Sequence, residues 1–415
     1  MTRRLCMAAI GVCVSCLSLA AVARDEPAAE KPPEKIMPPQ DGLYLGQTTF
    51  ERGEVKLLER AIGRKVAIVV DPLLSPGAEE AGEPGALSFN VEEAREYWEQ
   101  GYVVMAVAYE AYPGHKPFTV DKLIRGGYDK ELTRLVAQFR QFGKPMFFLT
   151  AREPNGVLSP YWGGYGPKGD KSFDWAFRNR KAFTEFKPPK GPEGNPKLFK
   201  GLGRDDQNDG IERLAAAQRY YYDFFIRREK LTFLTFESMG WAVGPPLVTD
   251  QPPDPAEAYE RKMFAKATFW DLYELIKDHT DWVSINWYVT THPGEEDEPG
   301  VSNVVRPLSD FTKSMDTFLT KLEKVAPGKP VLLTETGFPP PEAGKKMTEC
   351  MKLLLSHKNV KGVIFWTDSD TLCQVRPGEP EAKVLKAMIE KAPEKFPAKA
   401  TCFAAESEIK AVGPD

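Results

Sequence analysis

Six acidic residues lie where apolar runs of this sequence end: Asp71, Glu110, Glu153, Glu237, Glu335 and Asp368. Acids are rare in such runs, because burying a charge costs free energy unless the charge is paired. If the runs are strands whose ends meet, the carboxyl groups gather in one cleft, and their pKa values are pushed apart. One carboxyl group then stays protonated while another stays ionised. An acid beside an ionised carboxylate is what glycoside hydrolysis requires.

The elements that would position these acids alternate along the chain. Eight strand-like runs lie at residues 42–50, 65–72, 102–110, 145–153, 231–237, 282–289, 330–338 and 360–368. Between them are segments whose apolar residues repeat at intervals of three and four, as amphipathic helices do. Eight strands with intervening helices predict an α/β fold, a (β/α)8 or TIM barrel, whose active site is built at the C-terminal ends of the strands. A doubly wound open sheet is the competing fold.

The longest connections, at 156–208 and 238–256, follow the fourth and fifth runs, so both would lie on the active-site face. We expect a single catalytic domain at 42–392 with a long loop after strand 4, a Pro/Glu/Lys linker at 24–41 and a tail at 393–415. Residues 1–23 combine Arg3 and Arg4, an apolar stretch and a final Ala-Val-Ala, which predicts a cleaved signal peptide. The mature protein would be secreted, periplasmic or extracellular, with no membrane anchor.

Composition narrows the class of partner. A net charge of −4 argues against nucleic acid as a ligand and suits a neutral polymer. The 4 histidines form neither an HxH nor an HExxH pattern, so we expect no metal and no cofactor. After signal cleavage Cys350, Cys373 and Cys402 remain, which allows one disulfide at most. A monomer is the simplest expectation.

Two short motifs carry a resemblance to a known family. "REPNGVLSPYW" at the end of the fourth run and "LLTETGFP" at the end of the seventh resemble clan A glycoside hydrolases. The nearest similarity is to family 26, the β-mannanases, whose strand-four motif is His-Glu-Met-Asn-Gly followed by aromatics and Pro-Trp. The resemblance implies that Glu153 is the general acid/base and Glu335 the nucleophile.

The same resemblance implies substrate-binding roles for Asn155, Trp162, Tyr288 and Trp366. Tyr288 falls on the tyrosine that hydrogen-bonds the nucleophile, and Trp366 on the aromatic platform beneath the sugar. Arg152 stands where family 26 has His, and its guanidinium can donate hydrogen bonds to a sugar hydroxyl or a carboxylate. Glu237, at the end of the fifth run, is a further candidate for substrate binding.

The resulting hypothesis is an exported glycosidase that cleaves a β-linked polysaccharide, mannan or another hemicellulose, with retention of configuration. In a retaining pair the two carboxyl groups lie about 5 to 5.5 Å apart. The alternatives are a barrel that binds carbohydrate without cleaving it and a structural protein of the cell surface.

Overall fold

A computed structural model describes residues 35–48, 54–71, 74–76, 87–108, 123–124, 126–151, 210–243, 269–289, 307–366 and 375–400. All of them belong to one compact unit, which begins at Pro33. The predicted signal peptide and the long loop after strand 4 lie outside these ranges.

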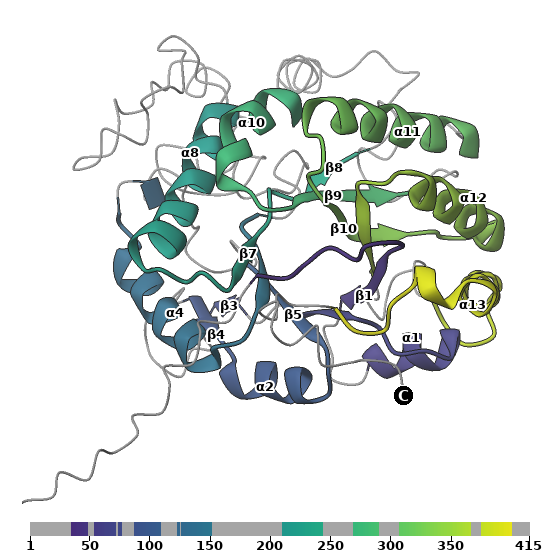
Figure 1. Cartoon of the computed structure of the whole chain (residues 1–415), viewed down its shortest axis with the longest axis horizontal. Coiled ribbons are helices and arrows are strands. Elements are labelled where there is room, and N and C mark those ends of the chain that lie inside the picture. Colours follow the sequence, from purple (N-terminus) through teal and green to yellow (C-terminus); the bar gives the residue numbers. More distant parts are fainter. Residues whose placement is uncertain are drawn as a thin grey trace, which may run out of the picture. The chain divides into compact units, whose positions relative to one another are not determined.

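The strands form a parallel ring with helices around it (Figure 1). Seven of the eight predicted runs each contain one strand: β1 (Tyr44–Thr48), β2 (Ile68–Asp71), β5 (Val103–Val107), β6 (Met146–Leu149), β9 (Val283–Tyr288), β10 (Val331–Gly337) and β11 (Val360–Phe365). β1 pairs in parallel with β2, β2 with β5, and β5 with β6, while β9 pairs with β10, β10 with β11, and β11 with β1. The predicted barrel is confirmed, and an open doubly wound sheet is excluded.

The fifth strand is divided into two short pieces, β7 (Leu234–Phe236) and β8 (Trp241–Ala242). β7 pairs with β6, and β8 pairs with β9. Between the two pieces, Glu237 forms a parallel bridge with Trp282, and the Ser238 N–H donates to the Trp282 carbonyl at 2.9 Å. These contacts close the ring. The sequence placed the end of this strand at residue 237 and therefore missed the second piece.

Helices cover the outside of the ring: α1 (Glu54–Ile62), α2 (Val91–Glu99), α4 (Asp129–Phe142), α8 (Gly210–Tyr222), α10 (Phe269–Ile276), α11 (Leu308–Val325), α12 (Ala343–Ser356) and α13 (Pro380–Lys391). α8 continues as a π-helix, Asp223–Arg228. A short antiparallel pair, β3 (Leu74–Pro76) and β4 (Leu87–Phe89), follows β2. None of the helices in the described ranges is both long and apolar enough to span a bilayer.

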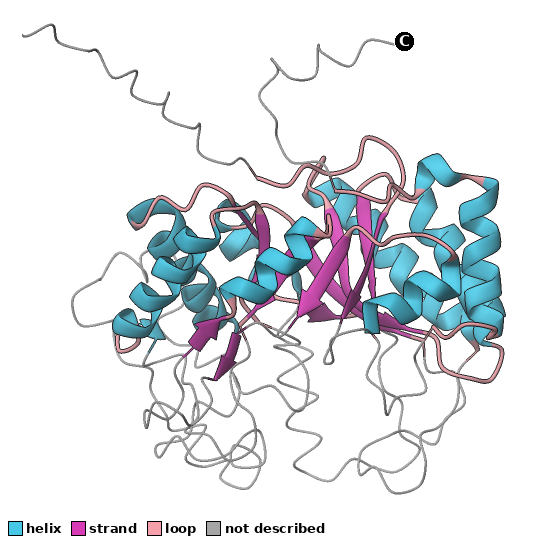
Figure 2. Cartoon of the chain, turned by 90° about the horizontal axis from the view of Figure 1, so that it is seen from below, coloured by secondary structure: helices cyan, strands magenta, loops and turns pink. Residues whose placement is uncertain are grey.

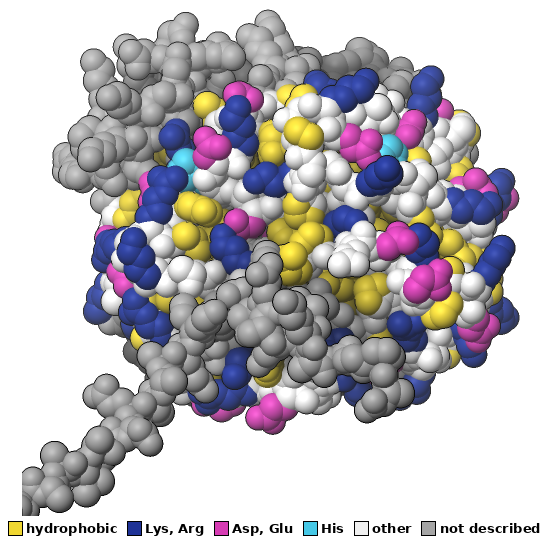
Figure 3. Space-filling model, viewed as in Figure 1, with side chains coloured by type: hydrophobic (Ala, Val, Ile, Leu, Met, Phe, Trp, Pro, Cys, Tyr) yellow, Lys and Arg dark blue, Asp and Glu magenta, His cyan; other side chains and the backbone are white. Residues whose placement is uncertain are grey.

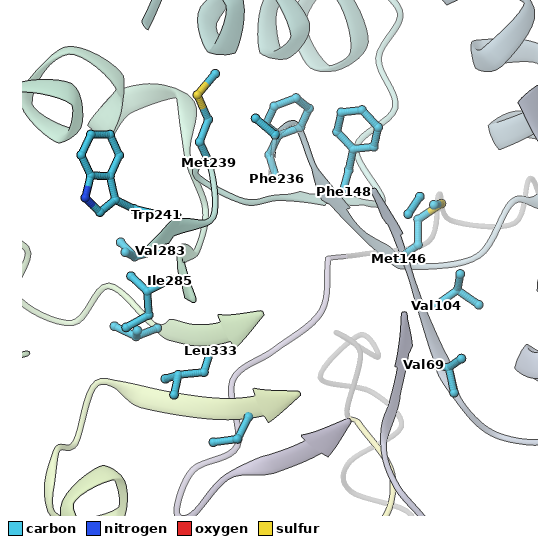
Figure 4. Packing of buried hydrophobic residues seen from close by; sticks show 14 of the residues in the cluster. Val69, Val104, Met146, Phe148, Phe236, Met239, Trp241, Val283, Ile285 and Leu333 are labelled. Atoms are coloured by element: carbon cyan, nitrogen blue, oxygen red, sulfur yellow. The ribbon is translucent and has the colours of Figure 1, made fainter. Parts of the chain in front are cut away.

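Side chains alternate between the two faces of the ring, because successive residues of a strand point to opposite sides. On β5, Val103 and Met105 belong to the barrel interior, whereas Val104 packs against the helices. Figure 4 shows the outward set, in which Val104, Phe148 and Leu333 point away from the centre of the ring. Burial on both faces explains why the strands read as nearly continuous apolar runs.

Residues 35–41 cross the end of the barrel at which the strands begin (Figures 1 and 2). Ile36 is only 2% exposed and joins the barrel-interior cluster. Its N–H donates to Thr235 Oγ1 at 2.8 Å, and Lys35 Nζ lies 2.7 and 2.6 Å from the carboxylate oxygens of Asp281. The sequence predicted a linker here without an apolar face. Its last residues instead plug the barrel.

The chain returns to the same end after α13. Phe396 and Ala400 are buried, and Ala400 belongs to the same interior cluster as Ile36. The Leu43 N–H donates to the Lys395 carbonyl at 2.8 Å. Gly42 has φ +79, and a Cβ there would lie 2.0 Å from the Lys395 oxygen, so glycine is required at this position. Figure 3 views this end, where hydrophobic surface lies near the centre and Lys and Arg side chains lie around it.

Candidate active site

Glu335 lies on β10 near the end of the barrel opposite the plug. Its side chain is only 5% exposed. Against β9, Leu333 pairs with Ile285 and Glu335 pairs with Asn286, so the register shifts between the two pairs. This shift is a β-bulge, a feature that re-aims side chains and is frequent beside active sites. The bulge places the Glu335 carboxylate on the inner face of the ring.

Tyr288, the last residue of β9, meets that carboxylate. The Tyr288 hydroxyl donates a hydrogen bond of 3.0 Å to Glu335 Oε2. The two residues were predicted from the sequence at the ends of neighbouring strands, and the structure brings their side chains together. A phenol that donates to a carboxylate restricts the rotation of the carboxylate plane.

Trp366 follows the last residue of β11 and is buried. Its backbone N–H donates a hydrogen bond of 2.9 Å to the Thr336 carbonyl, which joins the end of β11 to the strand that carries Glu335. Glu335, Tyr288 and Trp366 therefore come from three consecutive strands and lie towards the same end of the ring, where an active site of this fold is expected.

A polar layer that the sequence analysis did not single out lies beneath Glu335. Thr334 Oγ1 donates to Asn286 Oδ1 at 2.6 Å, and both side chains are almost completely buried. Gly240 packs against this pair, and its N–H donates to the Ala151 carbonyl at 2.9 Å. One signal was present in the sequence, because Asn286 precedes Tyr288 by two and must share its face of the strand. The bulge at Thr334 had no local signal.

Glu237 lies deeper than expected. Its side chain is 0% exposed, and Oε2 accepts a hydrogen bond from the Ser284 hydroxyl, while Oε1 has no hydrogen-bond partner among the residues that the structure describes. Burial raises the pKa of Glu237 to about 8, and the Ser284 hydrogen bond opposes this rise. Glu237 was predicted to bind substrate at a strand end. The structure places it inside the barrel, because the fifth strand resumes at Trp241.

The other predicted site residues lie outside the described ranges. They are Arg152, Glu153, Asn155 and Trp162, together with the strand-end acids Glu110 and Asp368. The chain is described up to Ala151, two residues before Glu153, and this residue is buried beside the fifth strand.

No group of three or more His, Cys, Asp or Glu side chains is placed to hold a metal ion within the ranges that the structure covers. Cys350, on α12, is a free and buried thiol, and burial raises its pKa to about 12. The other two cysteines of the predicted mature chain lie outside those ranges.

Comparison with known proteins yields matches of structure only. No family model matches the sequence, and no curated protein matches it. A GH26 endo-β-1,4-mannanase catalytic domain from a Bacillus species aligns over 86% of this chain and 87% of its own, with 12% identity and a TM-score of 0.49. The Bacillus subtilis mannanase BCman aligns over 83% and 84%, with 14% identity and a TM-score of 0.45.

A third similar structure is a β-mannanase from a symbiotic protist of the termite Reticulitermes speratus, in complex with a gluco-manno-oligosaccharide. It aligns over 86% of this chain and 91% of its own, with 14% identity and a TM-score of 0.44. Likeness at this level assigns neither a substrate nor a catalytic residue to this chain.

Proposed function

We propose that this protein is an exported glycoside hydrolase that cleaves a β-linked polysaccharide, mannan or another hemicellulose. The observation that carries the proposal is the hydrogen bond of 3.0 Å between the Tyr288 hydroxyl and Glu335 Oε2. A buried carboxylate on the inner face of a barrel, held by a phenol from the next strand, suits a nucleophile that must keep one orientation.

In the proposed mechanism Glu335 attacks the anomeric carbon while Glu153 protonates the glycosidic oxygen, and the leaving sugar departs. A glycosyl-enzyme ester on Glu335 results. Glu153, now ionised, removes a proton from water, and this water attacks the same carbon to release the sugar with retained configuration. The Tyr288 bond to Oε2 fixes the carboxylate plane, and attack proceeds from Oε1.

Aromatic and polar residues around the carboxylates would bind the polymer. We assign Trp366, Trp162, Asn155 and Arg152 to this role. An aromatic ring offers an apolar face on which the C–H side of a sugar ring can rest. Among these residues Trp366 is anchored by its backbone N–H to the strand of the nucleophile.

The test is release of reducing sugar by the mature protein from mannan, xylan, mixed-linkage glucan and cellulose. Glu335→Ala and Glu153→Ala are assayed in parallel, with Glu390→Ala, an exposed glutamate on α13, as the matched control. We expect turnover of one polymer class, a loss of about three or more orders of magnitude in both site variants, and full activity in the control.

Stereochemistry separates the retaining mechanism from an inverting one. Proton NMR in the first minutes of hydrolysis should detect the β-anomer of the newly formed reducing end, and an α-anomer would contradict the role of Glu335 as nucleophile. The wild-type protein could instead cleave none of the polymers while it and both site variants bind one of them. The protein would then be a carbohydrate-binding barrel and not an enzyme. Export is tested by the N-terminal sequence of the protein recovered outside the cytoplasm, which should begin at Arg24.

A further inference from the structure

Strand β10 contains one residue more than its neighbours at the level just below the Glu335 carboxylate. Leu333 pairs with Ile285 and Glu335 with the next residue, Asn286, so Thr334 is the additional one. The register against β11 also shifts between Leu333 and Thr336. The same bulge in β10 therefore shifts its register against both neighbouring strands, β9 and β11.

The bulge turns two successive side chains to the same face of the strand. Thr334 donates to Asn286, and Glu335 accepts from Tyr288. Asn286 and Tyr288 are two residues apart on β9 and share a face, so Thr334 and Glu335 share the facing side of β10. In a regular strand, successive residues would point in opposite directions, and Glu335 would face the helices whenever Thr334 faced the interior.

The contact between Thr334 and Asn286 is tight and enclosed. The distance from Thr334 Oγ1 to Asn286 Oδ1 is 2.6 Å, and the side chains are 2% and 1% exposed. Because the hydroxyl donates to Oδ1, the planar amide of Asn286 is held in one orientation. Gly240 closes the third side, since a Cβ there would lie 3.2 Å from Thr334 Oγ1 and 3.3 Å from Asn286 Oδ1.

We propose that Thr334 and Asn286 are positioning residues that hold the bulge, and with it Glu335, in the geometry for attack. This inference rests on the proposed glycosidase function. Tyr288 restrains the carboxylate, while the Thr334–Asn286 bond restrains the backbone from which the Glu335 side chain projects. A nucleophile reacts efficiently only when it is held at about 3 to 3.5 Å from its target, and a misplacement of about 1 Å costs on the order of 100-fold in rate.

The decisive variant is Thr334→Val, which keeps the branched shape and removes the hydroxyl. We expect kcat to fall about 10- to 100-fold with KM within about threefold, because a ground-state sugar is still bound but the nucleophile is misplaced. Thr334→Ser retains the donor and should recover most of kcat. The rate at which a 2-deoxy-2-fluoro glycoside traps the glycosyl-enzyme should fall in parallel with kcat.

The matched control is Thr235→Val. Thr235 is also fully buried on a strand, but its hydroxyl oxygen accepts a hydrogen bond of 2.8 Å from the Ile36 N–H at the plugged end of the barrel, away from Glu335. Loss of this hydroxyl should lower Tm and leave kcat unchanged. Equal kcat in the two variants would overturn the positioning role.

Gly240→Ala perturbs the same pair from another strand and serves if Thr334→Val does not fold. The added methyl group would press on Thr334 and Asn286, so we again expect a fall in kcat at nearly constant KM, and an unchanged kcat would overturn the inference. A wild-type protein without activity on any polymer overturns the proposed function and this inference together. Activity that Glu335→Ala abolishes but that Thr334→Val and Gly240→Ala leave intact overturns this inference alone.

Discussion

The Tyr288 hydroxyl and Glu335 Oε2 lie 3.0 Å apart across the strands β9 and β10. A hydrogen bond to a charged acceptor contributes about 1.5 to 3 kcal/mol. Tyr288→Phe should therefore reduce kcat about 10- to 100-fold on the polymer that the enzyme cleaves. Tyr273→Phe, which removes a hydroxyl on α10 outside the ring, is the control. Equal rates in the two variants would show that the Tyr288 contact has no part in catalysis.

Glu237 makes stability depend on pH. The pKa of its carboxyl group is raised from 4.5 to about 8 in the folded protein. Between these values the unfolded chain has lost the proton and the folded protein keeps it, so stability falls as pH rises, by on the order of 5 kcal/mol in total. Above about pH 8 both states are ionised and this dependence ends.

The variant Glu237→Gln should lack that dependence. Gln keeps an oxygen that can accept the Ser284 hydroxyl and carries no charge at any pH. Urea denaturation at pH 5 and pH 8 measures the unfolding free energy of variant and wild type. The wild type should lose stability between these two pH values relative to the variant, so the difference should favour the variant more strongly at pH 8. A constant difference across this range would mean that Glu237 does not titrate as its burial requires.

Ile36 should contribute to stability although it lies in a Pro/Glu/Lys-rich stretch. Its side chain fills the start of the barrel, and removing most of it leaves a cavity beside the interior cluster. We expect Ile36→Ala to cost about 2 kcal/mol or more in unfolding free energy. Gln40→Ala, at an exposed position of the same segment, should change it by less than about 0.5 kcal/mol. Guanidinium titration measures both, and equal values would contradict the plug.

Cys350 should be unreactive in the folded protein. The thiol is buried and its pKa is raised to about 12, so both access and thiolate formation are suppressed. Iodoacetamide at pH 8 should modify the peptide that contains Cys350 only in denaturant, as mass spectrometry would detect. Rapid modification without denaturant would indicate that α12 opens.

The strand positions could be read from the sequence because each strand is buried on both faces, which produces apolar runs that stand out against the helices. β10, for example, spans Val331–Gly337 within the predicted range 330–338. Glu335 was predicted because it lies at the end of such a run. Tyr288 and its contact with Glu335 were implied by the resemblance to family 26, and the structure contains that contact.

Features that depend on register or on single residues were not predictable. The bulge at Thr334 exists only relative to β9 and β11. Glu237 ends an apolar run but not the strand, because β8 begins at Trp241, after residues 237–240, whose sequence carries no strand pattern. Ile36 is one buried residue in a polar stretch, and one residue has no periodicity.

The N–H of Leu43 and the carbonyl of Lys395 are joined by a hydrogen bond of 2.8 Å at the plugged end of the barrel. The segment before β1 and the segment after α13 are therefore hydrogen-bonded to each other on the side of the barrel away from Glu335 and Trp366. A fusion partner, an affinity tag or a solid support attached through either flank would point away from the carboxylate, and joining the two flanks to make a circular permutant would need only a short bridge.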